Sequence, residues 1–194
     1  FMLQHEASKT ADFSHVRVVL YGASPIPEDV LVRALATFKC PFVQLYGMTE
    51  TSGSVTFLPP EAHVPGSAKL RSCGIPFHGI EIIIGDAARN AQPPGQVGEI
   101  MIRAPGIMKG YWNMPEATAE AVRNGWYHSG DAGYMDDEGF IYVYDRVKDM
   151  IVSGGENIYP AEIESALSKH PAVADIAVIG VPSDRWGEDV KAVV

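Results

Sequence analysis

The chain has 194 residues, of which 46% are hydrophobic, and its 24 acidic and 15 basic side chains give a formal net charge of -9. This apolar content is enough for the core of one large or two small globular domains, whereas the acidic balance argues against a nucleic-acid grip or a polybasic membrane patch. No apolar run approaches the roughly 20 residues that cross a bilayer, so we expect small-molecule partners, no nucleic acid and no transmembrane segment.

The cysteines and the two chain ends bear on the setting of the protein. Cys40 and Cys73 form neither a metal-binding spacing nor a disulfide framework, which favours a reducing cytoplasm. The chain starts at Phe1 without a methionine and stops at Val194 inside an apolar run. We therefore expect a piece of a longer protein, and the oligomeric state is left open.

The first part of the chain predicts an α/β unit, residues 1–66. An apolar β-rich run at 16–21 ends at Gly22-Ala23-Ser24, an amphipathic helical pattern covers 27–38, and a second strand at 41–46 ends at Gly47. Strand, helix and strand in this order indicate a parallel sheet. Ligands bind at the carboxyl ends of such strands, where both glycine-containing segments are expected to lie.

Residues 67–147 have a different sequence pattern from residues 1–66. Short strands at 80–84, 97–103 and 139–144 alternate with glycine and proline turns, and one helix is expected around 115–122. This pattern predicts a small β-barrel or folded sheet.

Residues 145–160 read as a junction, in which charged residues are followed by a short apolar strand at 150–152 and a Gly154-Gly155 turn. A helix at 160–169 and a strand at 176–181 indicate an α+β unit after it. We predict a large domain over 1–147 and, over 148–194, a hinge and the truncated beginning of a small α+β domain.

Each candidate site residue has an ordinary structural explanation. Glu50 reads as an exposed acid in a loop, and His128 to Asp131 as a tight turn closed by the aspartate. Arg146 reads as part of a surface ion-pair cluster worth less than ~1 kcal/mol. Gly154-Gly155 reads as a hairpin turn, and Trp186 as a packing residue.

The order of the motifs is more specific than any one of them. Tyr46-Gly47-Met48-Thr49-Glu50, then Tyr127-His128-Ser129-Gly130-Asp131, then Asp145 to Asp149 with Ser153 to Pro160, resembles the adenylate-forming superfamily. Within it the chain is most similar to AMP-forming acyl-CoA synthetases of the fatty-acid-CoA ligase type. The likeness runs from Val18 to Glu188 and includes Gly98-Glu99-Ile100 and Gly110-Tyr111-Trp112.

The resemblance implies an enzyme that joins a carboxylic acid to ATP, forming an acyl-adenylate and pyrophosphate, and then transfers the acyl group to coenzyme A with release of AMP. Such chemistry asks a protein for positioning and charge neutralisation. ATP, Mg²⁺ and coenzyme A are the cofactors it implies. A fatty acid is the expected substrate, with aryl and dicarboxylic acids left open.

The resemblance also implies residue roles for the nucleotide. Glu50 would hold Mg²⁺, a hard ion that takes oxygen ligands, and Thr49 would contact the α-phosphate. Gly22, Ala23, Ser24, Tyr46 and Gly47 would form the adenine site, with the Tyr46 ring against the base. Asp131 would bind the ribose hydroxyls, and Arg146 would reach the ribose and phosphate with its guanidinium fork.

The remaining implied roles belong to domain movement and to coenzyme A. Lys148 matches the hinge about which the small domain swings between the half-reactions. Gly154 and Gly155 would line the channel for the thiol, and Glu156 and Trp186 would contact coenzyme A. His128 is assigned no acid–base work.

Two elements of the family pattern are missing from the chain: the upstream Ser/Thr/Gly-rich phosphate loop with its lysine, and the downstream lysine that engages the carboxylate. We therefore expect this chain alone to be inactive. Two alternatives stay open, an adenylation domain that loads a carrier protein and a non-catalytic module that binds nucleotide or protein. The segment Ser153 to Asn157 favours free coenzyme A over a carrier protein.

Overall fold

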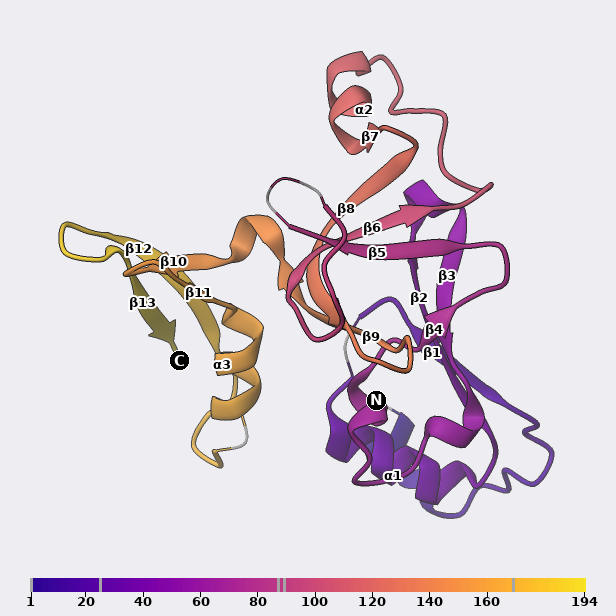
Figure 1. Cartoon of the computed structure of the whole chain (residues 1–194). Coiled ribbons are helices and arrows are strands. Elements are labelled where there is room, and N and C mark those ends of the chain that lie inside the picture. Colours follow the sequence, from indigo (N-terminus) through magenta and orange to yellow (C-terminus); the bar gives the residue numbers. More distant parts are fainter. Residues whose placement is uncertain (1, 25, 87, 89, 169) are drawn as a thin grey trace.

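The computed structural model describes residues 2–24, 26–86, 88, 90–168 and 170–194, so the predicted features at Phe1 and Lys169 lie outside the described residues. The described strands form three sheets of four, five and four strands. Figure 1 shows the first two sheets together in one body and the third, with helix α3, to one side of it. This arrangement makes the segment after β9 a connection between two structural units.

The first sheet contains the predicted α/β unit. Its strand order is β1-β2-β3-β4, with β1 (Val19–Gly22), β2 (Phe42–Met48), β3 (Gly53–Leu58) and β4 (Ile75–Pro76). β1 and β2 are parallel and α1 (Glu28–Phe38) connects them, whereas β3 and β4 are antiparallel additions. The apolar face of α1 buries Leu31 and Ala34, as its amphipathic pattern requires. The predicted strand, turn, helix and strand are confirmed.

The second sheet is antiparallel and is built around its longest strand. The strands are β5 (Glu81–Gly85), β6 (Gly98–Arg103), β7 (Val122–Arg123), β8 (Trp126–Met135) and β9 (Ile141–Arg146). β8 pairs with β6, β7 and β9, and α2 (Pro115–Ala121) precedes β7. A small barrel or a folded sheet was predicted here. The described strands pair in the order β5-β6-β8-β7, and β9 also pairs with β8, so they form an open sheet and not a closed barrel.

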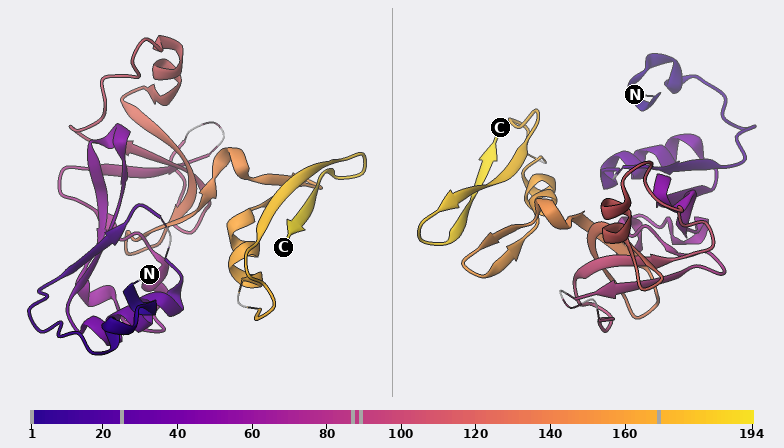
Figure 2. Two further views of the ribbon diagram at one scale, coloured as in Figure 1. Left: turned by 180° about the vertical axis from the view of Figure 1, so that it is seen from behind. Right: turned by 90° about the horizontal axis from the view of Figure 1, so that it is seen from above.

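The third sheet follows the junction. It has the order β11-β10-β13-β12, with β10 (Ile151–Ser153), β11 (Glu156–Ile158), β12 (Ala177–Ser183) and β13 (Gly187–Val193), and α3 (Pro160–Leu167) connects β11 to β12. Figure 2 shows the same separation of this unit from two further directions. Val152, predicted to be part of a buried strand, is 42% exposed, and Ile151 is the buried residue of β10.

Short 3-10 helices connect these elements. They lie at Met2–Gln4, Glu6–Lys9, Thr49–Thr51, Pro60–Ala62, Ala68–Arg71 and Val147–Asp149. The predicted domain boundary after residue 147 falls inside the last of them. No helix in the described part of the chain is long and apolar enough to cross a membrane.

The prediction of a tight turn at His128 to Asp131 is wrong. These residues lie inside β8, where the pairing with β6 shifts register between Glu99 and Met101. Gly130 has a φ of 71° and supplies the local distortion, which is a bulge within a strand. A serine–glycine–aspartate sequence has turn composition, but its backbone is held here by neighbouring strands.

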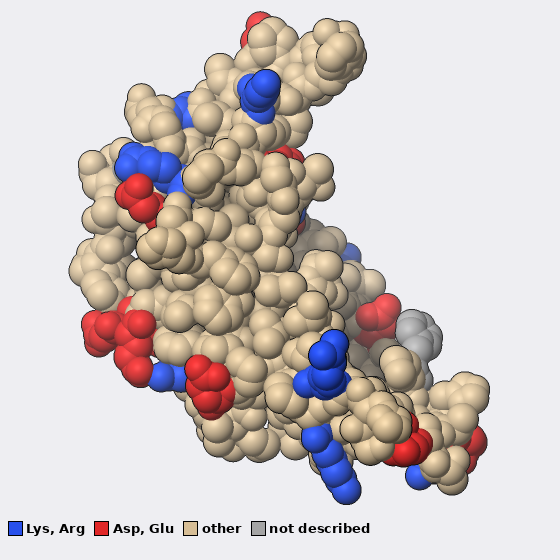
Figure 3. Space-filling model, turned by 90° about the vertical axis from the view of Figure 1, so that its right-hand side faces the viewer, with Lys and Arg blue, Asp and Glu red and all other residues tan. Residues whose placement is uncertain are grey.

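Charged side chains are scattered over the face of the molecule that Figure 3 presents. Lysine and arginine side chains alternate with aspartate and glutamate there, and uncharged surface separates them. Ion pairs on the surface include Lys69 with Glu138 and Arg103 with Glu81. Exposed pairs of this kind contribute little stability.

Candidate functional site

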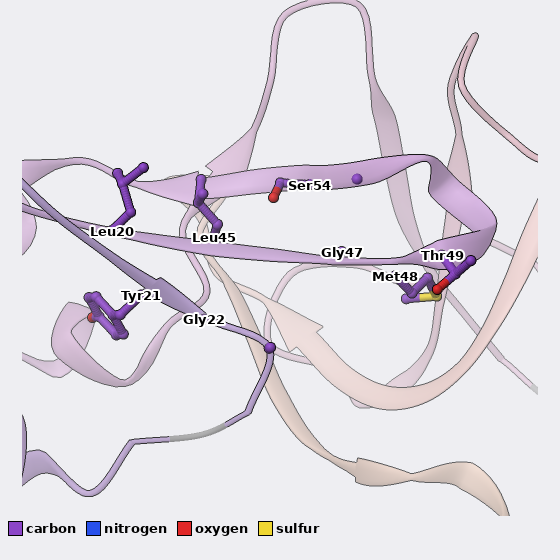
Figure 4. A pocket seen from close by; sticks show the side chains of 10 residues that line it. Leu20, Tyr21, Gly22, Leu45, Gly47, Met48, Thr49 and Ser54 are labelled. Carbon is purple, nitrogen blue, oxygen red and sulfur yellow. The ribbon is translucent and has the colours of Figure 1, made fainter. Parts of the chain in front are cut away.

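A pocket of about 510 Å³ lies at the carboxyl ends of β1 and β2. Four of the predicted site residues, Gly22, Ala23, Gly47 and Thr49, line it together with Leu20, Tyr21, Leu45, Met48, Gly53 and Ser54. Figure 4 shows these residues coming from β1, β2, β3 and the turn after β2. The predicted binding edge of the parallel sheet therefore carries a pocket, although Ser24 and Tyr46 are not among its lining residues.

Two glycines allow the strands around this pocket to approach closely. A Cβ atom at Gly22 would lie 2.1 Å from the carbonyl oxygen of Leu45, and one at Gly47 would lie 2.2 Å from that of Gly53. Neither backbone position has room for a side chain. Ala23 has a φ of 67°, which an L-residue adopts only at a cost.

Tyr46, Asp131 and Arg146 form one cluster between the first and second sheets. The Tyr46 hydroxyl donates to Oδ2 of Asp131 at 2.6 Å, and Nε of Arg146 lies 3.1 Å from Oδ1. Nη1 of Arg146 also donates to the carbonyl oxygen of Ser129 at 3.1 Å. Residues 85 positions apart are thus brought together, and three predicted nucleotide ligands meet at one carboxylate.

Asp131 is buried, with 10% of its side chain exposed. Burial raises the pKa of this carboxyl, and the Tyr46 hydrogen bond and the Arg146 charge oppose that rise. Burial, and then the Asp131 charge, raise the pKa of Tyr46, so its hydroxyl remains a donor. The two donors hold the carboxylate in a fixed orientation while each oxygen keeps acceptor capacity.

The backbone that carries Asp131 is fixed from β6. Glu99 accepts from Nδ1 of His128 at 2.8 Å and from the Gly130 N–H at 3.1 Å. The Ser129 hydroxyl donates to the Ile100 carbonyl and accepts from the Asp131 N–H. The buried His128 is thus part of a hydrogen-bonded support for the bulge.

Glu50 is the one carboxylate that the sequence assigned to Mg²⁺. It lies in the 3-10 turn after β2, and its Oε1 accepts from the Tyr111 hydroxyl at 2.9 Å. Among the described residues there is no group of three or more histidine, cysteine, aspartate or glutamate side chains that could hold a metal. A single carboxylate fits Mg²⁺ that is bound mainly by nucleotide phosphates and water.

Lys148 lies exposed in the 3-10 helix between the second and third sheets. It lines a second pocket, of about 410 Å³, together with residues of β10, α3, β12 and β13. Nearby, Oδ2 of Asp145 accepts from the Ala161 N–H at 3.0 Å, and the rings of Tyr144 and Tyr159 stack at 5.2 Å. These contacts connect the end of β9 to the first turn of α3.

Gly154 and Gly155 form the two-residue turn of the β10–β11 hairpin, with φ values of 61° and 88°. This conformation favours glycine at both positions. A Cβ at Gly154 would lie 2.9 Å from the Trp186 ring, and the Gly154 N–H donates to the Trp186 carbonyl. Glu156 and Trp186 are exposed, so the four residues predicted for coenzyme A lie near one hairpin at the surface.

Sequence reasoning missed the residues that support the predicted ligands. Tyr111 was noted only as part of a linking stretch, yet it bonds Glu50 across 61 positions. Glu99 and Ser129 hold the bulge that carries Asp131. Their residue types were visible, but pairing across strands depends on register.

A family model described as AMP-binding enzyme matches residues 1–112, and one described as AMP-binding enzyme C-terminal domain matches residues 162–194. The chain belongs to the AMP-binding enzyme family, whose members include the adenylate-forming ligases that its motifs resemble.

Two curated relatives and one solved protein show the range of similarity. A fatty acid–[acyl-carrier-protein] ligase of Streptomyces coeruleorubidus is 45% identical over 193 residues, 100% of this chain and 37% of that protein. A feruloyl-CoA synthase of an Amycolatopsis species is 48% identical over 190 residues, 98% of this chain and 38% of that protein.

The solved protein is o-succinylbenzoate-CoA synthetase of Bacillus subtilis. Its complex with the acyl-adenylate intermediate is 42% identical, with a TM-score of 0.82, and the match covers 91% of this chain and 36% of that one. Its complex with ATP and magnesium ion has 43% identity and a TM-score of 0.80, with the same coverage. The chain thus spans between about 36% and 38% of the length of these proteins.

Proposed function

We propose that the protein carrying this chain is an AMP-forming acid-thiol ligase. It activates a carboxylic acid with ATP to an acyl-adenylate, releases pyrophosphate, and transfers the acyl group to coenzyme A with release of AMP. The observation that carries this proposal is the Tyr46–Asp131–Arg146 cluster, a buried carboxylate oriented by two donors. A fixed carboxylate is suited to accept from two neighbouring ribose hydroxyls.

The pocket at β1 and β2 supplies the second support. Gly22, Ala23, Gly47 and Thr49 line this pocket, and Thr49 follows directly after the end of β2. We assign the adenine and acyl site to this pocket and to Ser24, with the Tyr46 ring at its border. We assign the α-phosphate to Thr49, the magnesium ion to Glu50 and the ribose to Asp131 and Arg146.

The domain assignment is part of the proposal. Residues 1–147 form the end of a large AMP-binding domain, and residues 148–194 form the hinge and the beginning of a small domain. Lys148 is the proposed pivot, and its exposure lets it change conformation without leaving a core. Gly154, Gly155 and Glu156 of the β10–β11 hairpin are assigned to coenzyme A together with Trp186, whose carbonyl oxygen accepts from the Gly154 N–H.

The proposed acid is a fatty acid, and the proposed location is the cytoplasm, where Cys40 and Cys73 stay reduced. Support for the acid comes from the relative named as a fatty acid ligase. The relative named as a feruloyl-CoA synthase supports aryl acids as the alternative substrate class.

A carrier protein is the second candidate acceptor. The relative from Streptomyces is named as a ligase for an acyl-carrier protein and matches the whole of this chain. Carrier proteins and coenzyme A both present a pantetheine thiol, so the same hairpin could serve either acceptor.

The test is a paired assay on the full-length gene product. Pyrophosphate release is measured with ATP and a panel of fatty acids of graded length, aryl acids and dicarboxylic acids, and thiol consumption is then measured with coenzyme A or acyl-carrier protein. We expect acid-dependent pyrophosphate release and consumption of coenzyme A. ATP turnover that does not depend on the acid, or the absence of any ATP turnover, would contradict the ligase assignment.

A further inference from the structure

The loop between β6 and α2 is fastened across the turn that carries Glu50, and Figure 1 shows these two segments meeting at one end of the molecule. The Met108 N–H donates to the Glu50 carbonyl at 2.7 Å, and the Ser52 hydroxyl donates to the Gly106 carbonyl at 2.7 Å. The third link is the Tyr111 hydroxyl, which donates to Oε1 of Glu50 at 2.9 Å. Two links fix the backbone and one fixes the carboxylate.

Tyr111 is itself held by α2. Its N–H donates to Oγ1 of Thr118 at 2.9 Å, and that hydroxyl donates to the Met114 carbonyl at 2.8 Å. A Cβ at Gly110 would lie 2.7 Å from Cγ2 of Thr118, so the loop packs tightly on the helix at this point. The Tyr111 ring therefore starts from a backbone position that α2 has fixed.

The hydrogen bond leaves the other carboxylate oxygen for a ligand. Within the described part of the chain, the side chain of Glu50 has one hydrogen bond, from the Tyr111 hydroxyl to Oε1. A phenol is a neutral donor, so it orients the carboxylate without cancelling its charge.

We propose that Tyr111, anchored by Thr118, is a positioning residue that orients the Glu50 carboxylate toward the magnesium ion bound with ATP. The inference rests on the proposed function, because it takes Glu50 as the magnesium ligand. Groups that orient a metal ligand typically change metal affinity by roughly 10-fold to 100-fold when removed. Tyr111 does not touch the ion or the nucleotide in this account and acts only through Glu50.

The test measures magnesium dependence in the full-length gene product. Binding of a non-hydrolysable ATP analogue is followed while free Mg²⁺ is titrated, for the wild type and for Tyr111→Phe, which keeps the ring and removes the hydroxyl. We expect the half-maximal Mg²⁺ concentration to rise roughly tenfold, with little change in melting temperature. Tyr142→Phe is the matched control, because its hydroxyl donates to another carboxylate, that of Asp136, in the β8–β9 turn.

Thr118 provides a second, independent arm. Thr118→Val removes the hydroxyl that anchors Tyr111 and should raise the half-maximal Mg²⁺ concentration in the same direction by a smaller factor. Thr118→Ser keeps the hydroxyl and should restore the wild-type value.

An unchanged Mg²⁺ dependence in Tyr111→Phe overturns the inference. A fall in melting temperature with unchanged Mg²⁺ dependence also overturns it, because that result describes a purely structural contact. If the wild type itself binds no ATP analogue with Mg²⁺, the proposed function is wrong, and the inference that rests on it is wrong as well. This outcome is seen in the wild type alone, so it is distinguished from a failure of the inference by itself.

Discussion

The two groups of predicted site residues are held very differently. Asp131 is buried, bonded by Tyr46 and Arg146, and carried on a strand whose bulge is fixed by Glu99. The Gly154–Gly155 turn, by contrast, lies at the surface of the third sheet. A site that must bind one ligand in one pose gains from fixed groups, whereas a segment that serves a later step must be free to move.

Backbone strain differs between the regions as well. In the connections between strands of the first sheet, Ala23, Lys39 and Ser52 have positive φ values without being glycine. In the third sheet the described residues with positive φ are glycines: Gly154, Gly155 and Gly187. Strained non-glycine residues persist only where the surroundings hold them, so the first sheet is the more strongly constrained of the two.

The largest expected effect is at the buried carboxylate. Asp131→Ala removes the proposed ribose acceptor and leaves Arg146 without its ion-pair partner, so we expect acid-dependent pyrophosphate release to fall about 100-fold, on the order of 3 kcal/mol. Asp137→Asn is the control, because Asp137 is exposed in the β8–β9 turn. Wild-type activity in Asp131→Ala would refute the ribose assignment.

The next effect separates the two regions directly. Gly154→Ala brings a methyl group against the Trp186 ring and strains a positive-φ position, so we expect thioester formation to slow about tenfold, or ~1.4 kcal/mol. Pyrophosphate release measured without coenzyme A should stay at the wild-type rate. An equal loss in both assays would mean that the hairpin does not belong to the thiol step.

A smaller effect concerns the pH dependence of nucleotide binding. The protonated Asp131 carboxyl loses acceptor capacity, and burial raises its pKa from the ordinary value of 3.8, so binding should be lost on acidification at a higher pH than for an exposed aspartate. Tyr46 opposes this rise, and Tyr46→Phe should therefore move the loss of binding to still higher pH and weaken binding by ~1.5 kcal/mol.

The measurement is AMP affinity against pH for the wild type and Tyr46→Phe. Tyr134→Phe is the comparison variant, since the ring of Tyr134 stacks on that of Tyr142. A midpoint that moves to lower pH in Tyr46→Phe would contradict the assigned electrostatics.

The smallest expected effect tests the strain in the first sheet. Ala23→Gly removes the strain of a left-handed conformation, which stabilises the folded state by ~1–2 kcal/mol. Glycine also gives the unfolded chain more conformational entropy, which lowers the unfolding free energy by ~0.4–1 kcal/mol. The net rise in unfolding free energy should be about 0.5 kcal/mol, measured by chemical denaturation. A net loss of stability would show that the Ala23 methyl group makes a packing contact that outweighs the strain.

The sequence predicted the elements whose patterns are local. The α1 helix and the β1 and β2 strands follow from residue periodicity, and their parallel pairing follows from the connecting helix. β3 was not predicted, although it pairs with β2 through most of its length. The turn predicted at His128 was wrong, because bonds from Glu99 and β6 hold those residues in a strand.

The candidate site was predicted as a set of residues and not as a geometry. Motif order placed Tyr46, Asp131 and Arg146 in one list, and the structure brings them to one carboxylate. Motif order could not reveal that Tyr111 supports Glu50, because that contact depends on how a loop from the second sheet crosses the first sheet. Contacts between distant segments are set by packing and register, which periodicity does not encode.

The most direct test of the central claim is a crystal structure of the full-length gene product with AMP. We expect both ribose hydroxyls to lie within hydrogen-bond distance of the Asp131 carboxylate, with Arg146 still paired to it and the base beside Gly22 and Ala23. A ribose bound elsewhere, with Asp131 still closed between Tyr46 and Arg146, would contradict it.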